Sequence, residues 1–229
     1  MTSTATATAG TGTETLFERL ATVWDELEAR LSEVPVLKKL DDGEVTIDDY
    51  LRLLFNLRQQ VVDGSAWISR AASSFDVDHF ELRSAAIKHA DEEHRDHQML
   101  ERDYVSVGGN LDDLRAGRKN VGSEALSAYL FQYASRPNPT GLLGAMFIIE
   151  GLGAQRAAGW ATRFQEVLGL ADKQVHFMRY HEQADAAHTG DMEAILTSGL
   201  VDDAAADEVV RCAQVVARLY ALQLEEMDR

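Results

Sequence analysis

Apolar residues recur at three- and four-residue spacing along most of the chain, and this pattern limits the possible folds more than any other feature. In the first such segment, Leu16, Leu20, Val23 and Leu27 lie on one helical face. Only three prolines occur in 229 residues, and two of them fall in the short breaker "RPNPTG" at 136–141. No segment shows the alternation of a half-buried strand. The pattern therefore predicts an all-α fold.

Seven helices are expected, separated by short turns. Thr46 precedes the second of them as an N-cap, with Asp49 in the first turn. Residues 1–13 are low-complexity Thr, Ala and Gly, so we expect a disordered segment there. Residues 14–229 are expected to form a single all-α domain, a seven-helix bundle. The expected helices cover residues 14–34, 47–74, 79–107, 123–135, 141–168, 171–199 and 203–228.

Charge and composition exclude several classes of partner. The formal net charge of −16 argues against nucleic acid and against an anionic membrane surface, because both require clustered Lys and Arg. No stretch reaches the roughly 18 apolar residues of a membrane span, and no signal sequence is visible. Cys212 is the only cysteine, which excludes an intramolecular disulfide and a thiolate metal cage. We expect a cytoplasmic protein.

A carboxylate lies inside the otherwise apolar stretch "GAMFIIEGLG" at 144–153. Burying an unpaired carboxylate costs several kcal/mol, so such a group is normally neutralised, paired or bound to a metal. Glu150 could pair with Arg156 or with Arg163. If it binds a metal instead, further ligands must come from elsewhere in the chain.

Six of the seven histidines fall in two short windows, and one of these windows has the spacing of metal ligands. His181, Asp185 and His188 form the pattern H-x3-D-x2-H in the sixth expected helix. At about 100° per residue, the three side chains spread over roughly 60° of one helical face. A single histidine there would more often be an ordinary hydrogen-bonded residue. The coincidence of three ligand-type residues on one face favours a metal site.

The third expected helix carries the other histidine window, "KHADEEHRDH" at 88–97. Glu93 lies about 40° from His97, so this i, i+4 pair can reach one ion. His94 lies about 60° from His97 and is an alternative ligand. Taken alone, the segment is typical of a solvated charged face. The remaining ligand-type residues point further from the expected axis and are poorer candidates: His89, Asp91, Glu92 and Asp96.

Three helices would thus present three imidazoles and three carboxylates to one region of the bundle. Nitrogen and oxygen ligands without sulfur suit iron or manganese, and bundle cores commonly hold dimetal carboxylate sites. Two ions would carry enough charge to satisfy three carboxylates. We therefore expect two iron ions, and ligand type alone does not separate iron from manganese. The predicted ligands are Glu93, His97, Glu150, His181, Asp185 and His188, with His94 as the alternative.

These motifs resemble those of the haem-oxygenase-like diiron oxidases and oxygenases. The resemblance rests on "DEEHRDH" (91–97), on the lone glutamate of "MFIIEGLG" (146–153) and on "HEQADAAH" (181–188). Their order and separations agree over residues 47–192. One departure concerns the third helix, where family members commonly have six residues between the glutamate and the histidine. Counting back from His97 in this way gives Ala90, and Glu93 lies one helical turn closer.

The resemblance implies a seven-helix haem-oxygenase-like bundle that activates O2 at a non-haem diiron site. The substrate would be a small molecule, such as an amino acid, an amine or a fatty-acid-like compound, oxidised in a biosynthetic pathway. The resemblance further implies a homodimer and allows an external electron donor. No substrate-binding residue is identified, and no catalytic residue beyond the metal ligands.

The sequence also allows other functions. The chain could be a cofactorless or mononuclear-metal oxidase of the same fold, a ferritin-like iron-binding protein, or an interaction protein that has lost its metal. A haem oxygenase would need a proximal histidine on the first helix, which has none. A thiaminase-like member of the fold would need a catalytic cysteine, and Cys212 has no histidine or carboxylate at helical spacing.

Overall fold

Every regular element among residues 15–227, which the computed structural model describes, is helical. A π-helical turn, Gly153–Ala157, joins α9 to α10 without a break. The α-helices are α1 (Leu16–Leu31), α2 (Pro35–Asp42), α3 (Ile47–Val61), α4 (Gly64–Ser74), α5 (Phe80–Glu93), α6 (His97–Ser106), α7 (Leu111–Ala116), α8 (Val121–Ala134), α9 (Leu143–Leu152), α10 (Ala158–Leu168), α11 (His176–Thr197) and α12 (Asp203–Glu225).

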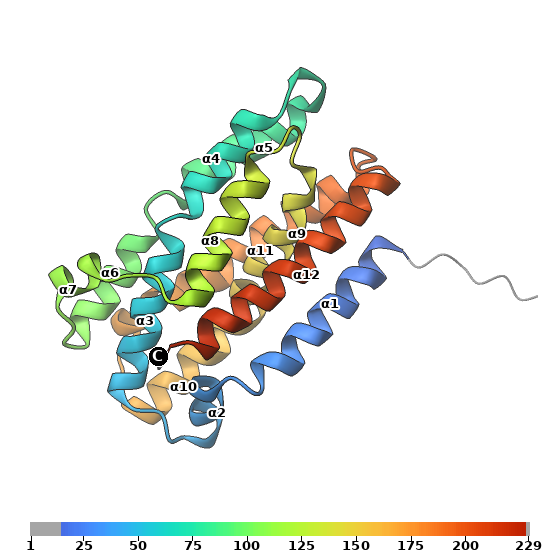
Figure 1. Ribbon diagram of the computed structural model, residues 1–229. Helices are drawn as coiled ribbons and strands as arrows, with labels where there is room; N and C mark the ends of the chain where they lie inside the picture. The colour runs from blue at the N-terminus through green and yellow to red at the C-terminus, as the bar shows by residue number, and fades with distance from the viewer. Residues whose placement is uncertain (1–14, 228–229) are drawn as a thin grey trace, which may run out of the picture.

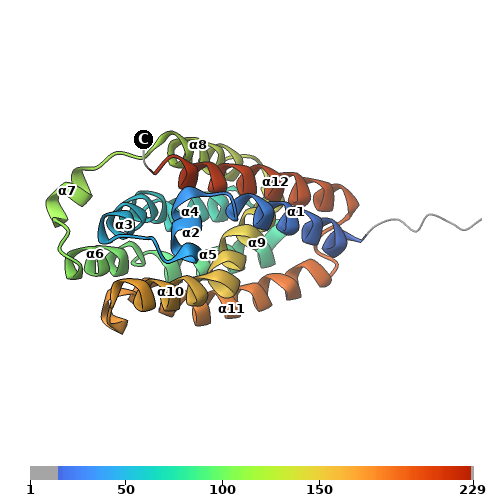
Figure 2. The same cartoon turned by 90° about the horizontal axis from the view of Figure 1, so that it is seen from below.

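The long helices run side by side in a bundle (Figure 1). Helix α12 packs against α1, α8 and α9, while α11 packs against α9, α6 and α10. Figure 2 shows α1, α8 and α12 along one side and α10 and α11 along the opposite side, with α3, α4 and α9 between them. Helix α9 is therefore covered on both sides, which explains why its sequence is almost entirely apolar.

The predicted all-α bundle is confirmed, but seven helices is too low a number for residues 15–227. Part of the difference comes from α2 and α7, two short helices in segments expected to be turns. The rest comes from three expected helices that are each divided in two, at 62–63 between α3 and α4, at 94–96 between α5 and α6, and at the π-helical turn between α9 and α10. Thr46 caps α3 as predicted, because its side chain accepts from the Asp49 amide. The expected disorder of residues 1–13 lies outside the described residues.

The break after α5 is a tight turn rather than a kinked helix. Its backbone bonds join residues three apart, from the Asp96 amide to the Glu93 carbonyl and from the Met99 amide to the Asp96 carbonyl. The turn redirects the chain, so residues after 94 no longer continue the faces of α5. This change of direction decides which residues reach the centre of the bundle.

Close packing of α9 places Glu150 deep in the protein. Gly144 lies against the backbone of α12, where a Cβ atom would clash with the Val209 carbonyl oxygen. Ala145 and Ile148, on the same helix, are fully buried. None of the helices in the described part of the chain is long and apolar enough to cross a membrane.

Candidate metal centre

Helix α11 supplies three polar residues on its core-facing side, His181, Asp185 and His188. Its apolar residues Met178 and Met192 are buried on the same face as His181 and Asp185. The start of the helix is fixed by Asp103 of α6, whose side chain accepts a hydrogen bond from the Phe177 amide at 2.8 Å. The predicted alignment of the α11 residues on one face is therefore what the structure shows.

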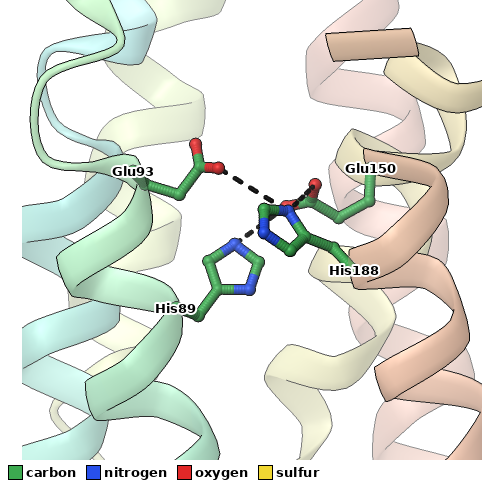
Figure 3. Close-up of side chains that lie close together, drawn as sticks. All are labelled: His89, Glu93, Glu150 and His188. Atoms are coloured by element: carbon green, nitrogen blue, oxygen red, sulfur yellow. Dashed lines mark hydrogen bonds and ion pairs between the residues drawn. The ribbon is translucent and has the colours of Figure 1, made fainter. Parts of the chain in front are cut away.

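Glu150 is buried and meets histidines rather than arginines (Figure 3). His188 Nδ1 lies 3.2 Å from Glu150 Oε2, and His89 Nε2 lies 3.1 Å from Glu150 Oε1. Arg156 instead pairs with Glu28, and Arg163 bonds the backbone of α2 and Glu166. Glu150 therefore forms an ion pair with neither arginine.

Two groups of ligand-type residues meet at this point, and they share one carboxylate. In each group, one ligand atom per residue lies within 4.8 Å of all the others. Glu93 belongs to both groups, so its two oxygens can serve two neighbouring ions. The first group is His89, Glu93, Glu150 and His188, and the second is Glu93, His181 and Asp185.

The π-helical turn makes room for Asp185. A Cβ atom at Gly153, the first residue of that turn, would clash with the Asp185 carboxylate. The carboxylate therefore occupies space that only a glycine leaves free. Such turns insert one residue into a helix and are frequent at functional sites. A cavity of about 90 Å³ lies here, lined by Glu93, Glu150, His181 and Asp185 among others.

The charges of these groups do not balance within the protein. Burial and the nearby Glu150 carboxylate raise the pKa of Glu93 to about 9 and that of Asp185 to about 10. Burial would raise the pKa of Glu150 as well, but the hydrogen bond with His188 and the close contact with the His89 ring hold it at about 2. Among residues 15–227, Asp185 Oδ1 is buried without a hydrogen-bond partner. Divalent cations would satisfy both the excess negative charge and this oxygen, so the residues fit a metal site.

The structure brings together five of the six predicted ligands but places His97 elsewhere. Because α6 starts at His97 after the turn, this side chain sits beside Arg58, Glu101 and Arg115. The expectation that His97 shares an ion with Glu93 is corrected accordingly. The alternative ligand His94 is exposed and bonds the Asp91 carbonyl, outside both groups.

His89 takes the place that the sequence assigned to His97. Its angle was measured from His97, across the turn that interrupts the helix. Measured from Glu93 within the unbroken α5, His89 is an i−4 neighbour and lies about 40° away. Helical angles measured from Glu93 instead of His97 would have identified His89 as a candidate ligand.

A larger cavity of about 490 Å³ lies on the side of the first group. His89 and His188 form part of its wall, and α4, α5, α9 and α11 contribute most of the rest. The apolar lining includes Trp67, Ile68, Leu82, Met146, Met192 and Ile195. Its size lies within the range of small-molecule binding sites.

Solved structures of low sequence identity share this fold. A domain of unknown function with a haem oxygenase-like fold from Shewanella denitrificans OS217 matches with a TM-score of 0.87 at 20% identity, over 93% of this chain and 91% of that one. A TenA homologue from Pseudomonas syringae pv. tomato DC3000 gives 0.77 at 16% identity, over 94% and 93%. A TenA homologue from P. horikoshii OT3 gives 0.70 at 13%, over 93% and 97%. These matches confirm the predicted haem-oxygenase-like fold.

Sequence comparison adds the family. No curated protein matches the chain. A family model described as iron-containing redox enzyme matches residues 65–221, a range that includes both ligand groups. The match covers more than half of the chain, which therefore belongs to the family of iron-containing redox enzymes.

Proposed function

We propose that the protein is a non-haem diiron oxidase or oxygenase that uses O2 to oxidise a small molecule. The observation that carries the proposal is the sharing of Glu93 between two groups of ligand atoms. A single shared carboxylate between two clusters is the arrangement that holds two ions close together in a helical bundle. Family membership supports iron as the metal.

Iron bound in these positions would supply the redox chemistry with O2, and the protein residues set its surroundings. Glu93 spans the two groups, while Glu150 and the histidines His89 and His188 complete the first. His181 and Asp185 belong to the second. All of these side chains are buried or half-buried, so the site is largely screened from solvent.

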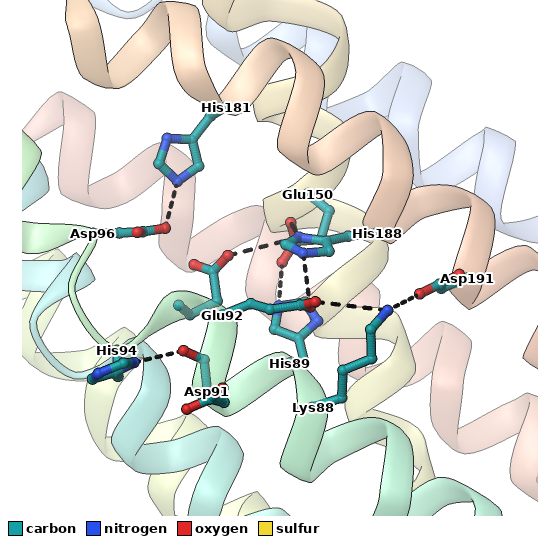
Figure 4. Close-up of polar contacts among 11 residues, drawn as sticks. Lys88, His89, Asp91, Glu92, His94, Asp96, Glu150, His181, His188 and Asp191 are labelled. Atoms are coloured by element: carbon teal, nitrogen blue, oxygen red, sulfur yellow. Dashed lines mark hydrogen bonds and ion pairs between the residues drawn. The ribbon is translucent and has the colours of Figure 1, made fainter.

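The cavity of about 490 Å³ is the proposed substrate pocket. It reaches the first group through His89 and His188, so a bound molecule would lie against that side of the site. Four Asp, Glu or Lys side chains also line the cavity: Glu81, Lys88, Glu92 and Asp191. Lys88 contacts Asp191 at 2.7 Å and Glu92 at 3.7 Å (Figure 4). An apolar interior with a polar edge suits a substrate with an apolar body and one polar end. Amino acids, amines and fatty-acid-like compounds all have this character.

Cysteine chemistry of the thiaminase type has no support in the structure. Cys212 is fully buried in α12, and burial raises the pKa of its thiol to about 12. A thiolate nucleophile requires the opposite environment. The homodimer, the external electron donor and the cytoplasmic location stay predictions.

The test is to load the metal-free protein with Fe²⁺ without oxygen and then mix it rapidly with O2 while absorbance is recorded. Iron per chain is measured on the same sample. Two irons per chain together with a transient visible absorption would support the proposal. Failure to bind iron above background, with no transient absorption, would overturn it. A single iron per chain would instead favour the mononuclear alternative.

A further inference from the structure

Asp96 lies where the sequence gives no reason to expect it. It ends the turn between α5 and α6, and it is only 5% exposed although its neighbours Arg95 and His94 are exposed. Its Oδ2 atom lies 3.0 Å from His181 Nε2 (Figure 4). The turn that removes His97 from the site therefore brings Asp96 into it.

The contact between Asp96 and His181 requires a proton or a metal ion between the two groups. His181 Nδ1 lies 2.8 Å from the Phe177 carbonyl oxygen, which can only accept, so this nitrogen carries the proton. In the neutral ring, Nε2 then presents a lone pair. A lone pair and a carboxylate oxygen at 3.0 Å repel each other unless a proton or a metal ion joins them.

The charges around this contact favour a metal ion over a single proton. Asp96 adds a third carboxylate close to those of Glu93 and Asp185. Among residues 15–227, the ion-pair partners of Glu93, Asp96 and Asp185 are histidines alone, with no Lys or Arg. One proton between Asp96 and His181 would satisfy that contact alone, whereas a divalent ion would satisfy all three carboxylates and the imidazole together.

We propose that Asp96 is a further metal ligand, and that it binds the second ion together with Glu93, His181 and Asp185. The inference rests on the proposed two-metal site and extends it. With three carboxylates and one imidazole, this position is richer in hard oxygen ligands than the first group, which has two of each. Mn²⁺ suits such ligands, which makes it an appropriate probe.

The test is a Mn²⁺ titration of the metal-free full-length protein, with free Mn²⁺ followed by electron paramagnetic resonance. The wild type is compared with Asp96→Asn and with Asp91→Asn, which removes an exposed carboxylate from the same segment. The wild type and Asp91→Asn are expected to bind two ions. Asp96→Asn is expected to keep one and to bind the other about 100-fold more weakly or worse, because changes to residues that only support a ligand cost about 10- to 100-fold.

Circular dichroism establishes that each variant is folded, and Asp96→Ser, with a smaller side chain, is the second variant if Asp96→Asn does not fold. Two ions bound by the Asp96 variants with less than about a 100-fold loss would overturn the inference and leave Asp96 as a residue that orients His181. A wild type that binds no ion would overturn the two-metal proposal as well. The wild-type titration thus separates the two failures.

Discussion

Two glutamates on either side of the turn between α5 and α6, half-buried Glu93 and buried Glu101, have opposite electrostatic surroundings. Glu101 of α6 lies 3.0 Å from Arg58 and 2.6 Å from Arg115. The Arg115 hydrogen bond, with that of Arg58, lowers the pKa of Glu101 despite its burial. Glu93 of α5 has no arginine or lysine partner among residues 15–227, and its nearest charged neighbours include other carboxylates.

The difference indicates that Glu101 has a structural role and that Glu93 has a metal-binding role. Where a buried carboxylate is structural, the protein provides its own cations, as at Glu101. Around Glu93 the protein provides carboxylates and imidazoles but no fixed cation. A region that is left short of positive charge in this way is suited to receive positive charge from outside, which is the physical argument for the metal site.

The largest expected effect comes from Glu93→Gln. This change removes the ligand shared by both groups, so we expect both irons to bind about 100-fold more weakly or worse. The metal-free protein should be no less stable, because a half-buried carboxylate with unfavourable neighbours is replaced by a neutral amide. Iron analysis and thermal unfolding of the same sample check both statements. Retention of two irons would contradict the assignment of Glu93.

The matched change on the other side of the turn is Glu101→Gln. It leaves Arg58 buried without its carboxylate, and removing one member of a buried ion pair costs roughly 3 to 5 kcal/mol. Because Arg115 is half exposed, we expect the lower end, about 3 kcal/mol. Iron content should not change. Chemical denaturation measures the free energy of unfolding, and a loss of iron without a loss of stability would reverse the comparison.

Gly153→Ala tests the close packing of the π-helical turn against the Asp185 side chain. The added methyl group would clash with the Asp185 carboxylate, and overpacking of this kind costs about 1 to 3 kcal/mol. We also expect weaker binding in the second group. Gly159→Ala is the control, because a Cβ there meets no atom within 4 Å. It should stabilise the helix by up to about 1 kcal/mol and leave iron binding intact.

The pH dependence of the free energy of unfolding should also distinguish the metal site from the rest of the protein. Glu93 and Asp185 have pKa values of about 9 and 10 in the metal-free folded protein, well above those of the unfolded chain. The folded state therefore holds protons that the unfolded state releases, and the free energy of unfolding falls as pH rises from about 5 to 9. Iron replaces these protons, so the loaded protein should lack this part of the decline.

Thermal melts at several pH values, with and without iron, provide the measurement. Burial raises the pKa of Asp103 to about 7, which adds a decline of the same sign. That group lies outside both ligand groups, so its contribution appears in both melts and cancels in the comparison. Parallel pH profiles with and without iron would contradict the proposed exchange of protons for metal.

The sequence was sufficient wherever a helix continued unbroken. Angular arithmetic places His181, Asp185 and His188 together because α11 has no interruption, and it identifies Glu150 because α9 is apolar on every side. It fails between Glu93 and His97, where no proline or glycine marks the turn. The turn depends on distant partners, since Asp96 contacts α11 and Glu101 contacts α3 and α7. Such contacts are invisible in local periodicity.

His97→Ala is the smallest expected effect and the sharpest test of that turn. His97 lies half-buried beside Glu101, where burial lowers the pKa of its ring, so its removal should leave iron affinity within about twofold and cost little stability. His89→Ala should weaken the ion of the first group by about 100-fold or more, because it removes a direct ligand. Iron titration of both variants decides the matter. If His97→Ala lost an ion and His89→Ala did not, α5 and α6 would have to form one continuous helix in the metal-bound protein, as the sequence arithmetic assumes. Asp96 would then leave the site, and the contrast between Glu93 and Glu101 would hold for the metal-free protein alone.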